Sequence, residues 1–327
     1  MCWTPDGRSA KVRRNMQAVI NVVIPVFAIV LAGFLCGRFR LLGTGGSEAL
    51  NGFVYFAALP ALFFGSLAKV EFGEILNWSY LGAYLLGTAA TGIAALVVGR
   101  IVFGARGAAL AVQNMAGLFS NTGYMGIPLA ITAFGANAAL PAILATVVNG
   151  ALIMGLYILW IEAEKSHGSH LVHVARDAIM GVARSPLVLS AVAGILCSGL
   201  RVPVPVPILT FCDIIGAAAP PAALFAMGLF MVGKSFKGEI VEVTIFSALK
   251  LIFHPLATFA IVLWLIPLAP LWRDVLLLMA ALPTGSLVFI LATQHQTYVR
   301  RATGIILAST LASVITLSWL LDYLEVR

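Results

Sequence analysis

The sequence predicts an all-α polytopic membrane protein with ten transmembrane helices in two inverted five-helix repeats. Of its 327 residues, 61% are hydrophobic and only 10% are charged, and the mean hydropathy is +1.02. A soluble domain carries about 25% charged residues. Apolar stretches that are long enough to cross a bilayer recur along the whole chain. Finally, proline and glycine motifs repeat between the two halves at a nearly constant offset.

The predicted helices follow the apolar stretches in chain order. We expect them at approximately 17–37, 48–68, 79–103, 108–134, 138–161, 179–200, 208–232, 243–267, 272–296 and 301–324. Residues 1–15 form an N-terminal extension without a pattern of its own, and Met16 is an alternative start. The first apolar run is interpreted as a membrane helix rather than a signal peptide, because no small-residue cleavage site follows it. The hydrophilic loop 162–178 separates a first repeat, 16–161, from a second, 179–327.

The internal repeat rests on matching residues in corresponding helices. The matches share an offset of 161 or 162 positions: Pro25 with Pro186, Gly33 with Gly194, Pro60 with Pro221, and Thr122 with Thr284. Because each repeat has five helices, an odd number, the second repeat enters the membrane from the opposite side. Inverted repeats of this kind are typical of secondary transporters, which bind their substrate near the middle of the bilayer.

The positive charges predict the orientation of the chain. The net charge is +7, and Lys and Arg residues such as Arg38, Arg100 and Arg300 lie in short loops between the predicted helices. Their distribution favours a cell (plasma or inner) membrane protein with both termini outside and the central loop in the cytoplasm. The chain has no basic run interleaved with aromatic residues, so we expect no nucleic-acid partner.

The fourth predicted helix, 108–134, carries the first candidate site. Pro128 removes a backbone donor and Gly123 loosens the same region, so we expect the helix to break there. Broken backbone at membrane depth is tolerated only where it faces protein or a watery cavity. Asn121 and Thr122 lie in this stretch and offer hydrogen-bond donors and acceptors. The positive end of the following half-helix would suit a carboxylate.

The ninth predicted helix, 272–296, mirrors the fourth. It carries Pro283-Thr284-Gly285, and Pro283 corresponds to Asn121 in the repeat. Two broken helices at matching positions indicate a transport site. The alternative interpretation is a pair of ordinary proline kinks, with small polar residues that serve helix packing.

Other polar residues within the predicted helices allow two interpretations each. Asn51 either lines the cavity or makes an interhelical hydrogen bond, and Pro60 is either a hinge or a structural kink. His254 either relays protons or is a packed histidine bonded to a backbone carbonyl. We expect Lys250 and Asp213 to lie at the membrane interface.

Motifs for enzymatic chemistry are absent from the sequence. There is no Walker loop, no HExxH and no GxSxG in a suitable context, so we expect neither an enzyme nor a cofactor. The four cysteines form no CxxC pair and are interpreted as buried thiols. His167, His170 and His173 could bind a metal, but a solvated loop explains them better, and no metal site is predicted.

The motifs in the broken helices resemble the auxin efflux carrier family, which includes bacterial carriers of malonate and malate. The matching stretches are Asn121-Thr122 with residues 125–129, Ala281-Leu282-Pro283 with Gly285, and Asn51 with Pro60. The resemblance implies that the fourth and ninth helices cross at their prolines and that Asn121, Pro128 and Pro283 belong to this crossover. It also implies an elevator-like carrier that forms a homodimer. The short central loop resembles that of bacterial members.

These inferences together predict a secondary transporter for a small organic anion in a lipid bilayer. The substrate would be a dicarboxylate such as malonate or malate, or an auxin-like carboxylate, moved by alternating access. Asn121, Thr122 and Thr284 would contact it. The alternatives are a sodium-coupled symporter of the bile-acid type, or a membrane receptor or channel. The sequence leaves the coupling ion open.

Overall fold

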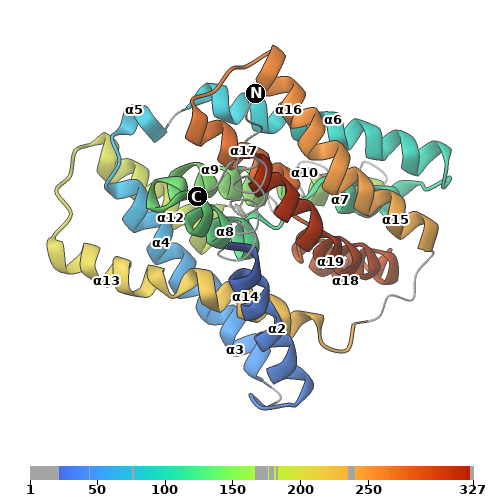
Figure 1. Ribbon diagram of the computed structural model, residues 1–327, viewed down its shortest axis with the longest axis horizontal. Helices are drawn as coiled ribbons and strands as arrows, with labels where there is room; N and C mark the ends of the chain where they lie inside the picture. The colour runs from blue at the N-terminus through green and yellow to red at the C-terminus, as the bar shows by residue number, and fades with distance from the viewer. Residues whose placement is uncertain are drawn as a thin grey trace, which may run out of the picture.

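The computed structural model describes residues 22–43, 45–75, 77–165, 176, 180–181, 183–234 and 240–324. All the regular elements among these residues are helices (Figure 1). The N-terminal extension 1–15 and the histidines of the central loop, His167, His170 and His173, lie outside the described residues.

The first half of the described chain contains nine α-helices and four short turns of other helix types. The α-helices are α2 (Ile24–Arg38), α3 (Gly46–Phe53), α4 (Leu59–Ala68), α5 (Phe72–Ile75), α6 (Trp78–Ile101), α7 (Gly107–Leu118), α8 (Ile127–Phe134), α9 (Ala139–Val147) and α10 (Met154–Lys165). The turns are the π-helical η2 (Val54–Ala58), η3 (Thr122–Gly126) and η5 (Val148–Ile153), and the 3-10 turn η4 (Ala136–Ala138).

The second half of the described chain contains eight α-helices and one π-helical turn. Its described elements are α12 (Pro186–Gly199), α13 (Val206–Ala217), α14 (Ala219–Met231), α15 (Ile240–Ala248), the π-helical η6 (Leu249–Phe253), α16 (His254–Trp264), α17 (Pro270–Ala281), α18 (Leu287–Gln294) and α19 (Val299–Tyr323).

The length and composition of these helices confirm a multi-pass membrane protein. Six described helices are long and apolar enough to cross a membrane: Gly46–Ala68, Phe72–Ile101, Ala136–Glu164, Val206–Met231, Ile240–Trp264 and Val299–Tyr323. Three shorter apolar helices are Ile24–Arg38, Thr122–Phe134 and Pro186–Gly199. Large hydrophobic side chains such as Phe56, Ile101 and Ile315 are exposed, which is the surface expected against lipid.

The helices form two groups that lie side by side (Figure 1). The small bundle consists of α2–α4 and α12–α14, in which α2 packs on α14, and α4 packs on α12 and α13. The large bundle consists of α6–α10 and α15–α19, in which α6 packs on α7 and α16, and α15 packs on α19. The turn η3 and helix α8 of the large bundle contact α14 of the small bundle.

Two equivalent glycines bring helices of the small bundle into close contact. A Cβ on Gly33 of α2 would lie 2.1 Å from the carbonyl O of Phe225 in α14. A Cβ on Gly194 of α12 would lie 3.1 Å from the carbonyl O of Phe64 in α4. Each residue of the second contact is separated by 161 positions from its counterpart in the first. Small residues allow such approach of membrane helices, whose association depends on packing.

Three prolines lie at the second position after a π-helical turn and do not break their helices. Pro60 follows η2, Pro128 follows η3 and Pro255 follows η6. A proline lacks a backbone donor and crowds the carbonyl four residues earlier, and the wider π turn accommodates both defects. The predicted fourth helix therefore continues through Pro128 as α8. It breaks earlier than the sequence predicts, at residues 119–121.

Candidate functional site

The two predicted broken helices meet through their backbones. After α7 the chain turns extended at Phe119, and after α17 it turns extended at Leu282. Asn121 N donates to Pro283 O and Gly285 N donates to Phe119 O, both at 2.9 Å. These bonds form an isolated antiparallel bridge between Ser120 and Thr284. We call residues 119–123 and 282–286 the junction.

Buried side chains form hydrogen bonds with further backbone groups at and beside the junction. The Thr284 hydroxyl donates to Ala116 O at 2.8 Å, which satisfies a carbonyl at the end of α7. Thr284 N donates to Ser309 Oγ at 3.1 Å, and Asn149 Nδ2 donates to Ser120 O at 2.8 Å. Unpaired backbone groups are costly away from water, so these bonds stabilise both breaks.

Two buried oxygen atoms at the junction have no partner among the described residues. They are Ser120 Oγ and Asn149 Oδ1, whose side chains belong to residues only 1% and 2% exposed. Buried polar groups are nearly always hydrogen-bonded, and a ligand or an ordered water is the usual explanation for an exception. The junction therefore has spare hydrogen-bonding capacity at the centre of the fold.

Asn121 places the junction against the small bundle. Its side-chain amide donates to Met227 Sδ of α14 at 3.6 Å, which is a weak contact, and the residue is only 4% exposed. The backbone carbonyl of Asn121 accepts hydrogen bonds from Met125 N and Gly126 N, at 3.2 and 3.0 Å. Asn121 thus lies where the two bundles meet, and its amide has no strong partner that a ligand would have to displace.

Two helical segments begin at the junction. The turn η3 with α8 begins at Thr122, and α18 begins at Leu287. The first N–H groups of a helix have no partner within that helix, and they carry the positive end of its dipole. Two such ends beside uncharged polar side chains are suited to bind an anion.

The structure brings most of the predicted site residues together, but not all of them. Asn121, Thr122, Gly123, Pro283, Thr284 and Gly285 belong to the junction. Pro128 lies in α8, beyond η3. Asn51 lies in α3, where its amide donates to Ser47 O at 2.8 Å, so its bond is local and neither of the two predicted roles is seen.

The sequence reasoning missed Asn149 and Ser309, the residues that hold the junction from α9–α10 and α19. Both lie in otherwise apolar predicted helices. Their polarity and, for Asn149, the following Gly150 were the available signals, but no proline lies beside either residue, so the pattern did not single them out.

The expected location of Lys250 was wrong. Its side chain is fully buried, and its ammonium donates to Ala280 O at 2.6 Å and lies 3.1 Å from His254 Nδ1. His254 is 1% exposed, so it is packed, but its imidazole contacts this ammonium rather than a backbone carbonyl. The lysine is held inside because the carbonyl at the end of α17 needs a donor.

A second buried charge, Glu242 of α15, was also missed because it lies at the edge of a predicted span. Its carboxylate accepts from Gln113 Nε2 and from the Tyr298 hydroxyl, and its Oε2 lies 3.1 Å from Arg301 Nη1. Burial, followed by the bond to Glu242, raises the pKa of the Tyr298 phenol well above its usual range. The phenol therefore remains a donor, and the cluster joins α7, α15 and α19.

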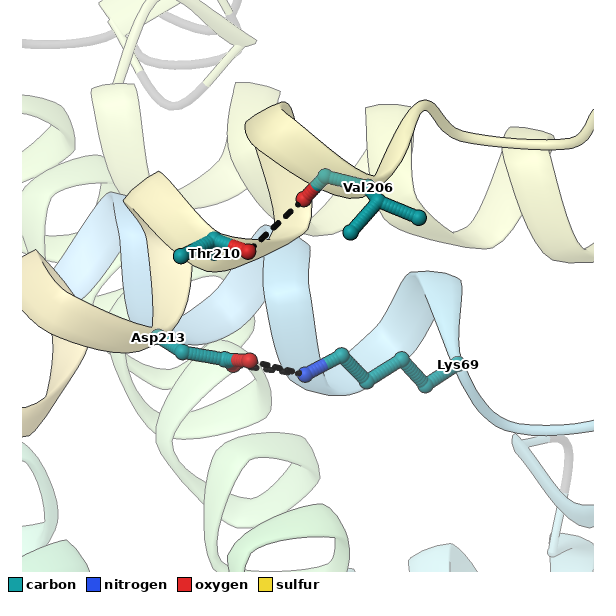
Figure 2. Close-up of polar contacts among 4 residues, drawn as sticks. All are labelled: Lys69, Val206, Thr210 and Asp213. Carbon is teal, nitrogen blue, oxygen red and sulfur yellow. Dashed lines mark hydrogen bonds and ion pairs between the residues drawn. The ribbon is translucent and has the colours of Figure 1, made fainter.

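A separate surface cavity of about 680 Å³ lies between α4 and α13 on one side and α8, α9 and α17 on the other. At its edge, Lys69 Nζ contacts the two carboxylate oxygens of Asp213 at 2.5 and 2.8 Å (Figure 2). Both side chains are substantially exposed, as expected for Asp213 at an interface. Such an exposed pair contributes little to stability. None of the predicted site residues lines this cavity.

The sequence is similar to those of several known proteins, including two that are named as transporters. The chain is 29% identical over 308 residues to the “Putative malonate transporter” of Rhizobium meliloti (strain 1021), which covers 94% of this chain and 96% of that protein. It is 23% identical over 308 residues to an uncharacterized transporter of Methanocaldococcus jannaschii, with 92% and 97% covered. A match of 26% over 273 residues to the lysosomal cholesterol signaling protein of Mus musculus covers 77% of this chain and 30% of that protein.

A family model described as membrane transport protein matches residues 18–321, which is nearly the whole chain. The match extends across both halves of the chain and includes all the junction residues. The chain therefore belongs to the membrane transport protein family, the family of the auxin efflux carriers, and is a multi-pass membrane transporter.

Proposed function

We propose that this transporter is a secondary carrier that moves a small organic carboxylate by alternating access, with its binding site at the junction. The observation that carries the proposal is the hydrogen-bonded meeting of two broken helices deep within the fold. Broken helices that meet in this way supply free backbone groups at membrane depth without exposing them to lipid.

The polarity of the junction favours an anionic substrate. The N-terminal ends of η3–α8 and α18 offer N–H groups, and Asn121 and Thr122 add side-chain donors. The substrate's carboxylate would bind to these groups. The Thr284 hydroxyl already donates its only proton to Ala116 O, so it would line the site and would bind the carboxylate only after releasing that carbonyl. Malonate is the first candidate, because the Rhizobium relative carries that name.

The inverted repeat would allow the movement between the two bundles that alternating access requires. Repeats at 16–161 and 179–327, each with five membrane passes, would place both termini outside and the loop 162–178 in the cytoplasm. The equivalent contacts Gly33–Phe225 and Gly194–Phe64 support a twofold relation within the small bundle. The large bundle, which contains the junction, would then slide or rock against the small bundle. We also propose a homodimer in the cell membrane, which light scattering of the purified protein would test.

The test is uptake of labelled malonate into proteoliposomes that contain the purified protein. Asn121→Ala should reduce uptake by at least tenfold, because it removes a donor from the junction. Asn51→Ala is the matched control, because the Asn51 amide bonds locally, and it should retain uptake within about twofold. Equal activity of the two variants, or no saturable uptake of any carboxylate by the wild type, would contradict the proposal.

Ion gradients in the same assay distinguish the alternative carriers. Uptake that requires an inward sodium gradient would indicate a sodium-coupled symporter of the bile-acid type. Uptake that follows the pH gradient would indicate proton coupling. A channel or a receptor would show no saturable accumulation in either condition.

A further inference from the structure

Lys250 is the buried cation that the proposed function does not yet use. It lies in η6, which packs against α7, α17 and α19 of the large bundle. Its nitrogen lies 2.6 Å from the carbonyl O of Ala280 and 3.1 Å from Nδ1 of His254, and neither partner is a carboxylate. His254 Nε2 is also buried and has no partner among the described residues.

The direction of the helix carbonyls places the ammonium group near the junction. Carbonyls of an α-helix point toward its C-terminus. Ala280 is the last residue but one of α17, so the ammonium lies at the end of this helix, where the chain enters the junction. Pro283 is three positions beyond Ala280, and fully extended residues span at most roughly 3.5 Å each. The charge therefore lies on the order of 10 Å from the bridge between the two breaks.

The amine of Lys250 has no carboxylate partner in the part of the chain that the structure describes. Among the described residues, the carboxylates that form ion pairs do so with other basic residues, and the buried Glu242 is paired with Arg301. The negative end of the α17 dipole compensates only part of a full charge. A buried cation in a membrane protein normally has an anionic partner or a functional reason to lack one.

We propose that Lys250 is protonated when the substrate is bound and supplies the positive charge that balances the carboxylate at the junction. The inference rests on the proposed function and deepens it, because it explains why the site takes an anion rather than a neutral molecule. Lys250 is a positioning residue for the charge of the substrate and need not touch the substrate. With an effective dielectric constant of about 20, a charge about 10 Å away favours an anion over an uncharged analogue by roughly tenfold.

The experiment compares the affinities of the purified protein for malonate and for malonamide, its uncharged analogue, by calorimetry. Lys250→Met removes the charge but keeps an unbranched side chain, and Lys250→Arg keeps the charge. Arg100→Met is the matched control, because it removes an exposed cation at the end of α6. Lys250→Met should weaken malonate binding about tenfold and leave malonamide binding unchanged. Lys250→Arg and Arg100→Met should retain the wild-type preference for malonate.

The preference for the anion is a quantity that a merely structural role would not alter. If Lys250→Met weakens both ligands equally, or leaves their ratio unchanged, the proposal is wrong. If Lys250→Met does not fold, the wild-type protein provides the test. A ratio near one between its affinities for malonate and malonamide also contradicts the proposal. Asn121→Ala should weaken the binding of both ligands. Unchanged affinities in this variant would show that the ligands do not bind at the junction. A wild-type protein that binds neither ligand would contradict both proposals.

Discussion

At the residue scale, Gly285 shows how closely the two segments of the junction approach. A Cβ at this position would lie 3.0 Å from the Phe119 ring and 3.1 Å from Ser120 O. A Cβ on Gly123 would have Thr146 Cγ2 as its nearest neighbour, at an ordinary 3.5 Å. The close packing of the junction therefore requires a glycine at position 285, whereas position 123 has room for a side chain.

This difference predicts the effect of a single methyl group. Gly285→Ala should push Phe119 and the facing backbone apart, at a cost of about 1–3 kcal/mol, and should lower both thermal stability in detergent and malonate uptake. Gly123→Ala should be tolerated. Thermal unfolding of the two variants beside the wild type would check this, and equal stability of both would contradict the close approach.

The sequence predicted the residues of the junction that lie beside proline and glycine, because these residue types have a direct effect on the backbone. Asn121, Thr122 and Pro283 were found in this way. Asn149 and Lys250 were not placed correctly, since their roles depend on carbonyls of distant helices, Ser120 O and Ala280 O. A sequence pattern does not show which carbonyl a break will leave free.

At the element scale, prolines have two different effects in this fold. Pro128 lies in a continuous helix after a π turn, whereas Pro283 follows an extended residue, Leu282, with ψ of 151°. The residue before a proline is disfavoured in the α conformation. Pro283 therefore helps to end α17, and Pro128 does not end a helix. The break after α7 has no proline at all. The sequence placed the break around Gly123 and Pro128, with Asn121 and Thr122 inside it, whereas α7 already ends at Leu118.

A matched pair of proline substitutions tests this distinction. Pro283→Ala removes the restriction on Leu282, lets α17 extend into the junction and should reduce malonate uptake by about tenfold. Pro128→Ala restores a donor within a helix that already continues, and uptake should remain within about threefold of the wild type. The uptake assay in proteoliposomes measures both, and a larger loss in Pro128→Ala would show that the assignment of the break is wrong.

At the scale of the whole molecule, the structure contains one bundle that packs through glycines and another that is held by buried polar contacts. In the small bundle, Gly33 and Gly228 bring α2 and α14 to backbone contact. In the large bundle, the Glu242 cluster joins α7, α15 and α19. Composition alone predicted the membrane class. The division into bundles required the spatial contacts, because the helices of each bundle come from both halves of the chain.

The central claim is that a carboxylate binds at the junction, where the two bundles meet. Its most direct test is protection of a cysteine at Gly123, a half-buried junction position with room for a side chain, in a protein whose four native cysteines are replaced. Malonate should slow the reaction of Gly123→Cys with a small thiol reagent, with half-protection near the concentration that half-saturates uptake. It should not protect Ser66→Cys, which lines the separate surface cavity. Modification of Gly123→Cys at the same rate with and without saturating malonate would contradict the account.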